Sequence, residues 1–179
     1  MFLRSLLICF ALATAAHAAE APSSDAGRAA IARLPQLLGD WEGEGWMRTG
    51  PGEPQRFIGR EHVETRLDGQ VLLIEGKHYS LDRNRVVHDA LAVLSYDESA
   101  GDYDFRAQVA GRPPGHFRGH VDGDAFVWEM PTPRGKMRYT IRVVDDQWIE
   151  KGEMESANGW QQFFEMKLKR VTQAAANGR

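Results

Sequence analysis

Glu61, His78 and His88 are the residues of this sequence whose types and spacing come nearest to a chemical site. Each lies in a run of alternating apolar and polar residues, which is typical of a half-buried β-strand. If the turn at residues 82–84 closes a hairpin, His78 and His88 face each other and Glu61 lies diagonal to His78. Opposed residues have Cβ atoms about 5 Å apart and diagonal residues about 7 Å apart, so the three side chains fall within reach of one another.

Such a cluster is compatible with three kinds of chemistry. It could hold Zn²⁺ with an open coordination position, bind a ligand carboxylate through a protonated histidine, or form a buried hydrogen-bonded network. We favour the network and assign no catalytic and no metal-binding residue. His116 and His120 cannot share an ion, because four residues along a strand separate them by roughly 13 Å.

The rest of the sequence gives little support for an enzyme. It contains no Ser-centred elbow, no glycine-rich phosphate loop, no Cys-x-x-Cys and no helical His-Glu-x-x-His. Whether the protein is an enzyme stays open at this stage, and the balance is against it.

From Gly39 onward, apolar residues recur with period two and turn residues follow about every ten positions, which predicts an all-β meander. Ten such strands would leave two bare edges in an open sheet. We therefore expect an antiparallel up-and-down β-barrel of about ten strands. The predicted strands are 41–47, 56–67, 70–81, 86–96, 103–110, 116–121, 124–130, 136–143, 148–155 and 160–171.

Carrying the pairing through every turn predicts one inward face, which is mostly apolar and includes Leu67 and Trp160. Inward glycines such as Gly43 and Gly59 either allow the bends of a small barrel or leave room for a ligand. A mostly aromatic wall with a few polar groups is typical of a small-molecule pocket. The predicted ligand-binding residues are Glu61, His78, His88, Tyr139, Glu150 and Gln162.

The N-terminus has the pattern of a signal peptide. Residues 1–18 combine a basic Arg4, an apolar run and the small-x-small site Ala16-His17-Ala18, which predicts export to the periplasm or beyond. Residues 19–24 form a predicted polar linker, and Ser24 is the predicted N-cap of a short helix that reaches Leu38 and is kinked or split at Pro35. The only cysteine, in the apolar run, lacks the small neighbour of a lipoprotein site.

Composition predicts one domain over residues 25–171 and a disordered tail over 172–179. Removing residues 1–18, whose only formal charge is Arg4, changes the net charge from −3 to −4. No basic stripe points to nucleic acid, and no segment after the signal peptide has the roughly 20 apolar residues of a membrane span. The sequence does not indicate the oligomeric state.

Two resemblances support the barrel. Gly39, Trp41 and Arg170 resemble the lipocalin and calycin closure, in which a basic side chain covers the first-strand tryptophan. More closely, the chain resembles a bacterial family of exported lipocalin-like proteins of unassigned function. The segments that carry this second resemblance are 39–45 (GDWEGEG), 88–91 (HDAL) and 163–170 (FFEMKLKR).

The chain is also distantly similar to the nitrobindins, ten-stranded barrels that hold haem through a histidine near the C-terminus. Here the last histidine is His120, and the final strand has Phe, Met and Gln instead. We therefore expect no haem site of that type and no other cofactor.

Together these patterns favour a periplasmic lipocalin-like protein that binds a small apolar or aromatic ligand inside the barrel. Two alternatives remain: an enzyme that uses Glu61, His78 and His88, with or without a metal, and a domain with a filled barrel that acts through surface contacts.

Overall fold

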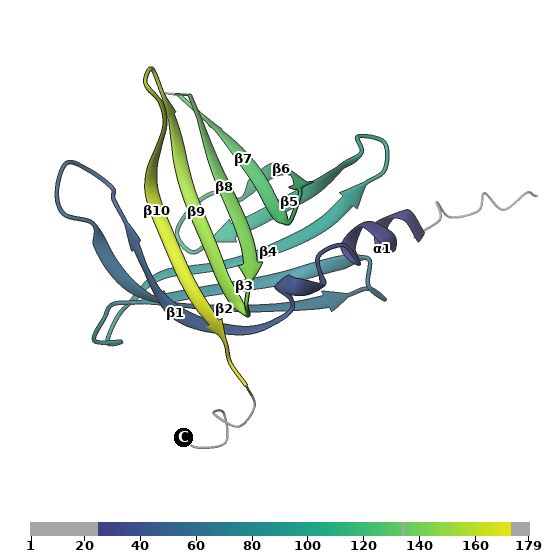
Figure 1. Cartoon of the computed structure of the whole chain (residues 1–179), viewed down its shortest axis with the longest axis horizontal. Coiled ribbons are helices and arrows are strands. Elements are labelled where there is room, and N and C mark those ends of the chain that lie inside the picture. Colours follow the sequence, from purple (N-terminus) through teal and green to yellow (C-terminus); the bar gives the residue numbers. More distant parts are fainter. Residues whose placement is uncertain (1–24, 134, 173–179) are drawn as a thin grey trace, which may run out of the picture.

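The computed structural model describes residues 25–133 and 135–172 as a closed antiparallel barrel with a short helix at its N-terminal side (Figure 1). This confirms the expected fold class. The strands are β1 (Gly39–Met47), β2 (Gln55–Arg66), β3 (Val71–Tyr79), β4 (Val86–Asp97), β5 (Asp102–Val109), β6 (Gly115–Asp122), β7 (Ala125–Thr132), β8 (Gly135–Val144), β9 (Gln147–Ser156) and β10 (Gly159–Arg170).

Each strand pairs with its neighbours in sequence, and β1 pairs with β10 to close the barrel. The turns match this topology. Asp145 and Asp146 between β8 and β9 have φ angles of 50° and 55°, as in the mirror-image turns whose twist fits a two-residue hairpin. Closure gives hydrogen-bond partners to the outer edges of the first and last strands, which would otherwise be exposed.

The inner wall changes character along the barrel axis. At the end where β1 begins, the inward side chains are almost completely buried, and they include Trp41, Val63, Leu94, Trp148 and Leu168. Toward the opposite end, inward side chains such as Phe117, Trp128, Tyr139, Phe163 and Ala107 are only partly buried. Solvent therefore reaches the interior from the end opposite the start of β1.

Two short helical segments cover the buried end. The helix α1 (Asp25–Ile31) contacts β3 and β4, and the 3₁₀ helix η1 (Pro35–Leu37) follows it, so the expected helix is split at Pro35. The Tyr103 hydroxyl donates to the Ala30 carbonyl at 2.7 Å, which ties the helix to β5.

Several predictions concern residues outside the described chain. The signal peptide, the linker and the Ser24 cap all lie there, as does most of the predicted C-terminal tail. No helix within residues 25–133 and 135–172 is long and apolar enough to cross a bilayer.

The predicted inward directions of Leu67, Trp160 and Gln162 are wrong. Leu67 is 70% exposed, because it occupies a turn with a φ of 50° instead of continuing β2. In β10 a bulge between Gln162 and Phe164 shifts the register, so Gln162 pairs with Glu153 on the outer face and Trp160 lies against Arg138 outside the barrel. A bulge inserts one extra residue and reverses the facing of everything before it in the strand.

Candidate functional site

The barrel register brings Glu61, His78 and His88 together, as the spacing predicts. His78 lies opposite His88, and Glu61 lies opposite Gly76, two residues along β3 from His78. The Glu61 Oε1 and His78 Nε2 atoms are 3.0 Å apart, and both side chains are only 9% exposed. Gly76 makes room for the carboxyl, since a Cβ there would lie 2.8 Å from Glu61 Oε2.

Three rings form a stack across β2, β3 and β4. The His78 ring lies between Phe57, at 4.6 Å and 5° between ring planes, and His88, at 4.8 Å and 28°. The nitrogen lone pairs of stacked imidazoles point along nearly parallel planes and do not converge on one ion. Within the described part of the chain, no group of three or more His, Cys, Asp or Glu has a metal-binding arrangement.

A second carboxyl reaches the interior from β9. Glu150 faces inward from a strand that does not pair with β2, and the Trp148 Nε1–H donates to its Oε2 at 3.3 Å. Glu61 lies opposite Trp41, and the Trp41 ring packs against Trp148 at 5.7 Å, so one pair of indoles connects the two carboxyls. The charge of Glu61 raises the pKa of Glu150. Tyr139 is close by, and burial followed by the charge of Glu150 raises the pKa of its hydroxyl.

Burial dominates the ionisation of these groups. It raises the pKa of Glu61 from 4.5 to about 8, and burial together with repulsion from Glu61 raises the pKa of Glu150 to about 8 as well. Desolvation disfavours whichever form is charged, so the histidine shifts have the opposite sign. Burial lowers the pKa of His78 to about 4, and burial with the charges of His78 and Arg112 lowers that of His88 to about 4.

These shifts favour the uncharged forms of the polar cluster. A hydrogen bond joins the Glu61 carboxyl to Nε2 of His78, and the indole N–H of Trp148 donates to the Glu150 carboxyl. An uncharged cluster of this kind offers hydrogen-bond donors and acceptors to a ligand.

An aromatic wall faces the cluster. Trp128 stacks on Tyr139 with ring centroids 4.3 Å apart and planes within 5°, and Phe117 and Phe105 pack against Trp128 at 5.2 Å and 5.0 Å. Phe163 adds an edge-on contact to Tyr139 at 5.7 Å. The sequence pattern missed Phe163, because only the β10 bulge turns it inward; two adjacent phenylalanines in one strand were the available signal.

Of the six predicted ligand-binding residues, five lie on the inner wall and one does not. Gln162 is exposed on the outer face, where its amide donates to the Phe164 carbonyl at 3.2 Å and lies 3.4 Å from Glu165 Oε2. It has no part in an interior site.

The three residues assigned to barrel closure meet at the buried end. The Arg170 guanidinium lies over the Trp41 ring, 4.1 Å from its centroid, and donates to the carbonyls of Leu38 and Gln36. Gly39 has a φ of 115°, and a Cβ at this position would lie 2.8 Å from the Arg170 Nη1 atom. The glycine therefore permits both the turn into β1 and the close approach of the guanidinium.

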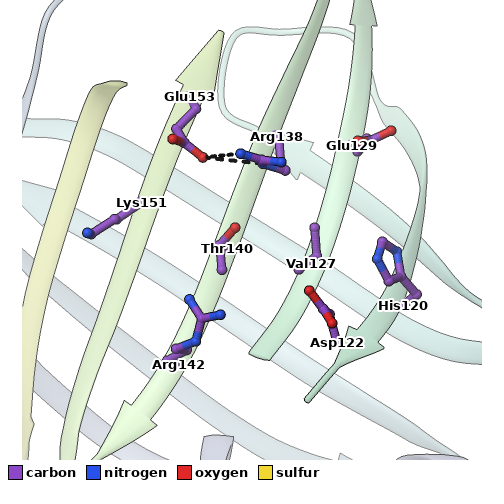
Figure 2. Close-up of a pocket in the computed structure, with 9 residues that line it drawn as sticks. All are labelled: His120, Asp122, Val127, Glu129, Arg138, Thr140, Arg142, Lys151 and Glu153. Atoms are coloured by element: carbon purple, nitrogen blue, oxygen red, sulfur yellow. Dashed lines mark hydrogen bonds and ion pairs between the residues drawn. The ribbon is translucent and has the colours of Figure 1, made fainter. Parts of the chain in front are cut away.

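A separate hollow of about 400 Å³ lies on the outer surface of β6 to β9 (Figure 2). Its charges largely satisfy one another: Arg138 Nη2 lies 2.7 Å from Glu153 Oε2, and Arg142 Nε lies 3.0 Å from Asp124. A solvated surface of paired charges gives no directional site for a ligand. The lining residues are His120, Asp122, Val127, Glu129, Arg138, Thr140, Arg142, Lys151 and Glu153.

No protein-family model matches this sequence, and no curated protein matches it. Among solved structures, the crystal structure of Rv2717c from M. tuberculosis is similar, with a TM-score of 0.63 and 16% identity over 80% of this chain and 98% of that chain. The two chains share the fold of a closed antiparallel β-barrel. At this level of identity the likeness describes the architecture, and the chemistry of the interior depends on the residues of this chain.

Proposed function

We propose that this protein is an exported binding protein of the lipocalin type, which takes a small, largely aromatic ligand into the barrel interior. The observation that carries the proposal is the partly exposed inner wall, which combines the stacked pair Trp128 and Tyr139 on β7 and β8 with the polar cluster of Glu61, His78 and His88 on β2 to β4. An apolar wall with a few convergent polar groups is the usual composition of a small-molecule site.

The sizes of the inward side chains support a barrel interior that can hold a ligand. Small residues line the inner wall on β4 and β5, namely Ala90, Ala92 and Ala107, and Ala92 lies opposite Ala107. Large rings line the wall on β5 to β8. A flat aromatic ligand against the rings would thus have room on the side of the small residues.

Titration with 1-naphthylmethanol, a neutral aromatic alcohol, tests the proposal. Trp128 lies on the predicted contact surface, so binding should quench tryptophan fluorescence saturably with one site per chain. Ala107→Trp should block the interior and abolish the quenching, because Ala107 faces inward between Ala92 and Gly115.

The matched control is Gln108→Trp, the next residue on the exposed outer face, which should leave binding unchanged. Melting temperatures of both variants establish that they fold. If Ala107→Trp does not fold, Tyr139→Leu provides a second variant, which should weaken binding at least fivefold by removing the stacked ring. Equal binding by wild type, Ala107→Trp and Tyr139→Leu would place the ligand outside the barrel, and no binding by wild type would favour a filled barrel that acts through surface contacts.

A further inference from the structure

We infer that the ligand carries a basic nitrogen, and that this nitrogen binds as a protonated amine between Glu61 and Glu150. The inference rests on the proposed function, since it names the chemical class that the same interior site accepts. The two carboxyls reach the interior from β2 and β9, on opposite sides of the β1 and β10 pair.

Neither carboxyl has a cationic partner among the described residues. Glu61 contacts only the imidazole of His78 at hydrogen-bond distance, and Glu150 contacts only the indole N–H of Trp148. Arg170 lies on the inner face at the end of the barrel where β1 begins. Its guanidinium already contacts the Trp41 ring, two backbone carbonyls and Asp146. Buried carboxyls ordinarily occur with a paired cation, so this pair is arranged for a cation that the chain does not supply.

Aromatic surfaces stand beside the two carboxyls. Tyr139 interacts electrostatically with Glu150 and stacks on Trp128, while Phe57 and Phe164 stack at 5.9 Å next to His78. The faces of such rings attract cations, and the attraction grows when water is excluded. A protonated amine on an aromatic body therefore satisfies the charged and the apolar parts of the site together.

Arg112, in the connection between β5 and β6, is exposed to solvent. Its charge lowers the pKa of His88 and of Tyr139, so it acts on the β4 and β8 side of the interior. A ligand anion would keep both carboxyls in their protonated form and would gain no ion pair from them.

Amine binding must be coupled to proton release. Burial raises the pKa of both carboxyls to about 8 in the free protein, and a cation placed between them favours their ionised forms. Each carboxyl that ionises gives its proton to the buffer. A neutral ligand that merely accepts a hydrogen bond from a protonated carboxyl releases none, which separates the two modes of binding.

Calorimetric titration with three naphthalene probes of similar shape tests the inference. The probes are 1-naphthylmethylamine, 1-naphthylmethanol and 1-naphthoate, measured at pH 7 in two buffers that differ in ionisation enthalpy. We expect the amine to bind at least tenfold more tightly than the alcohol, the carboxylate to bind most weakly, and the amine alone to release roughly one proton per site.

Glu61→Gln and Glu150→Gln remove the charge and keep the shape. Each should reduce the preference for the amine to less than threefold and should reduce the proton release, while binding of the alcohol stays within twofold of wild type. Glu75→Gln is the matched control, because Glu75 is exposed on the outer face of β3.

The outcomes separate the two proposals. Equal affinity for amine and alcohol, or an amine preference that survives both glutamine variants, would overturn the inference and leave the aromatic binding site standing. Failure of all three probes to bind wild type would overturn the proposed function, and the inference with it.

Discussion

The guanidinium of Arg170, in the last strand, covers the indole of Trp41, in the first, with the cation 4.1 Å from the ring centroid. The same indole donates its N–H to the Leu37 carbonyl at 2.9 Å and packs edge-on against Trp148 at 5.7 Å. One side chain thus joins the 3₁₀ helix, the closing strand pair and β9. This contact makes the two ends of the chain interdependent for stability.

Trp41→Ala should lower the free energy of unfolding by about 3 to 5 kcal/mol, the range for deleting a buried large aromatic side chain. Trp41 is 1% exposed, so the variant leaves a cavity in the sealed end of the barrel. Chemical denaturation followed by circular dichroism measures the loss. Trp46→Ala, on the outer side of the same strand, should cost much less; similar losses for the two variants would contradict the anchoring role of Trp41.

Arg170→Met should cost about 1 to 2 kcal/mol, because methionine keeps the apolar stem and loses the cation over the ring and the bonds to the Leu38 and Gln36 carbonyls. In the Trp41→Ala background the same substitution should cost measurably less. A double-mutant cycle gives this coupling. Strict additivity of the two losses would show that Arg170 and Trp41 act independently.

Stability should fall as the pH rises from 6.5 to 8. The folded pKa values of Glu61 and Glu150, about 8, lie above the unfolded value of 4.5, so the folded state binds more protons and loses stability as they dissociate. His78 and His88 make stability rise with pH, but only below pH 6.5, because their pKa values are 6.5 in the unfolded chain and about 4 in the folded protein. We expect a loss of about 1 to 2 kcal/mol per carboxyl over this interval.

Glu61→Gln and Glu150→Gln should each flatten that pH dependence and make the protein more stable than wild type at pH 8. Denaturant midpoints at half-unit pH steps measure the effect. Glu75→Gln should follow the wild-type curve. A wild-type midpoint that is constant between pH 6.5 and 8 would show that the two carboxyls are ionised in the folded protein.

Titration with ferric haem should give no stoichiometric, saturable shift of the Soret band. The fully buried inward side chains of β10 are Phe164, Met166 and Leu168, which are 4%, 1% and 0% exposed and offer no imidazole. His78 is engaged by Glu61 and stacked between two rings. A saturable shift that disappears in His78→Ala or His88→Ala would restore a haem site in this barrel.

The exported protein should begin at Ala19 and carry no lipid. Residues 16–18 fit the small-x-small cleavage rule, and Ile8 precedes the only cysteine where a lipoprotein signal has a small residue. Intact-mass measurement on a periplasmic fraction of cells expressing the full chain checks this. Recovery of the protein with residues 1–18 still attached would contradict export by this route.

The strand number and most of the register could be predicted from the sequence, because alternation and turn chemistry are local properties. Val63 lies opposite Ile74 and His78 opposite His88, as the hairpin turns predict. The same reasoning placed Glu61 within reach of His78, since neighbouring strands have a fixed separation. Those parts of the candidate site follow from pairs of adjacent strands.

Tertiary structure decided what adjacent strands do not determine. The bulge before Phe164 turns Phe163 inward and Gln162 outward, and no local pattern specifies where an extra residue is accommodated. Glu61 and Glu150 lie on strands that do not pair, so their relative placement depends on the curvature of the closed barrel. Their raised pKa values follow from burial, which exists only once the barrel has closed around them, whereas the inward direction of both side chains was already present in the alternation of the sequence.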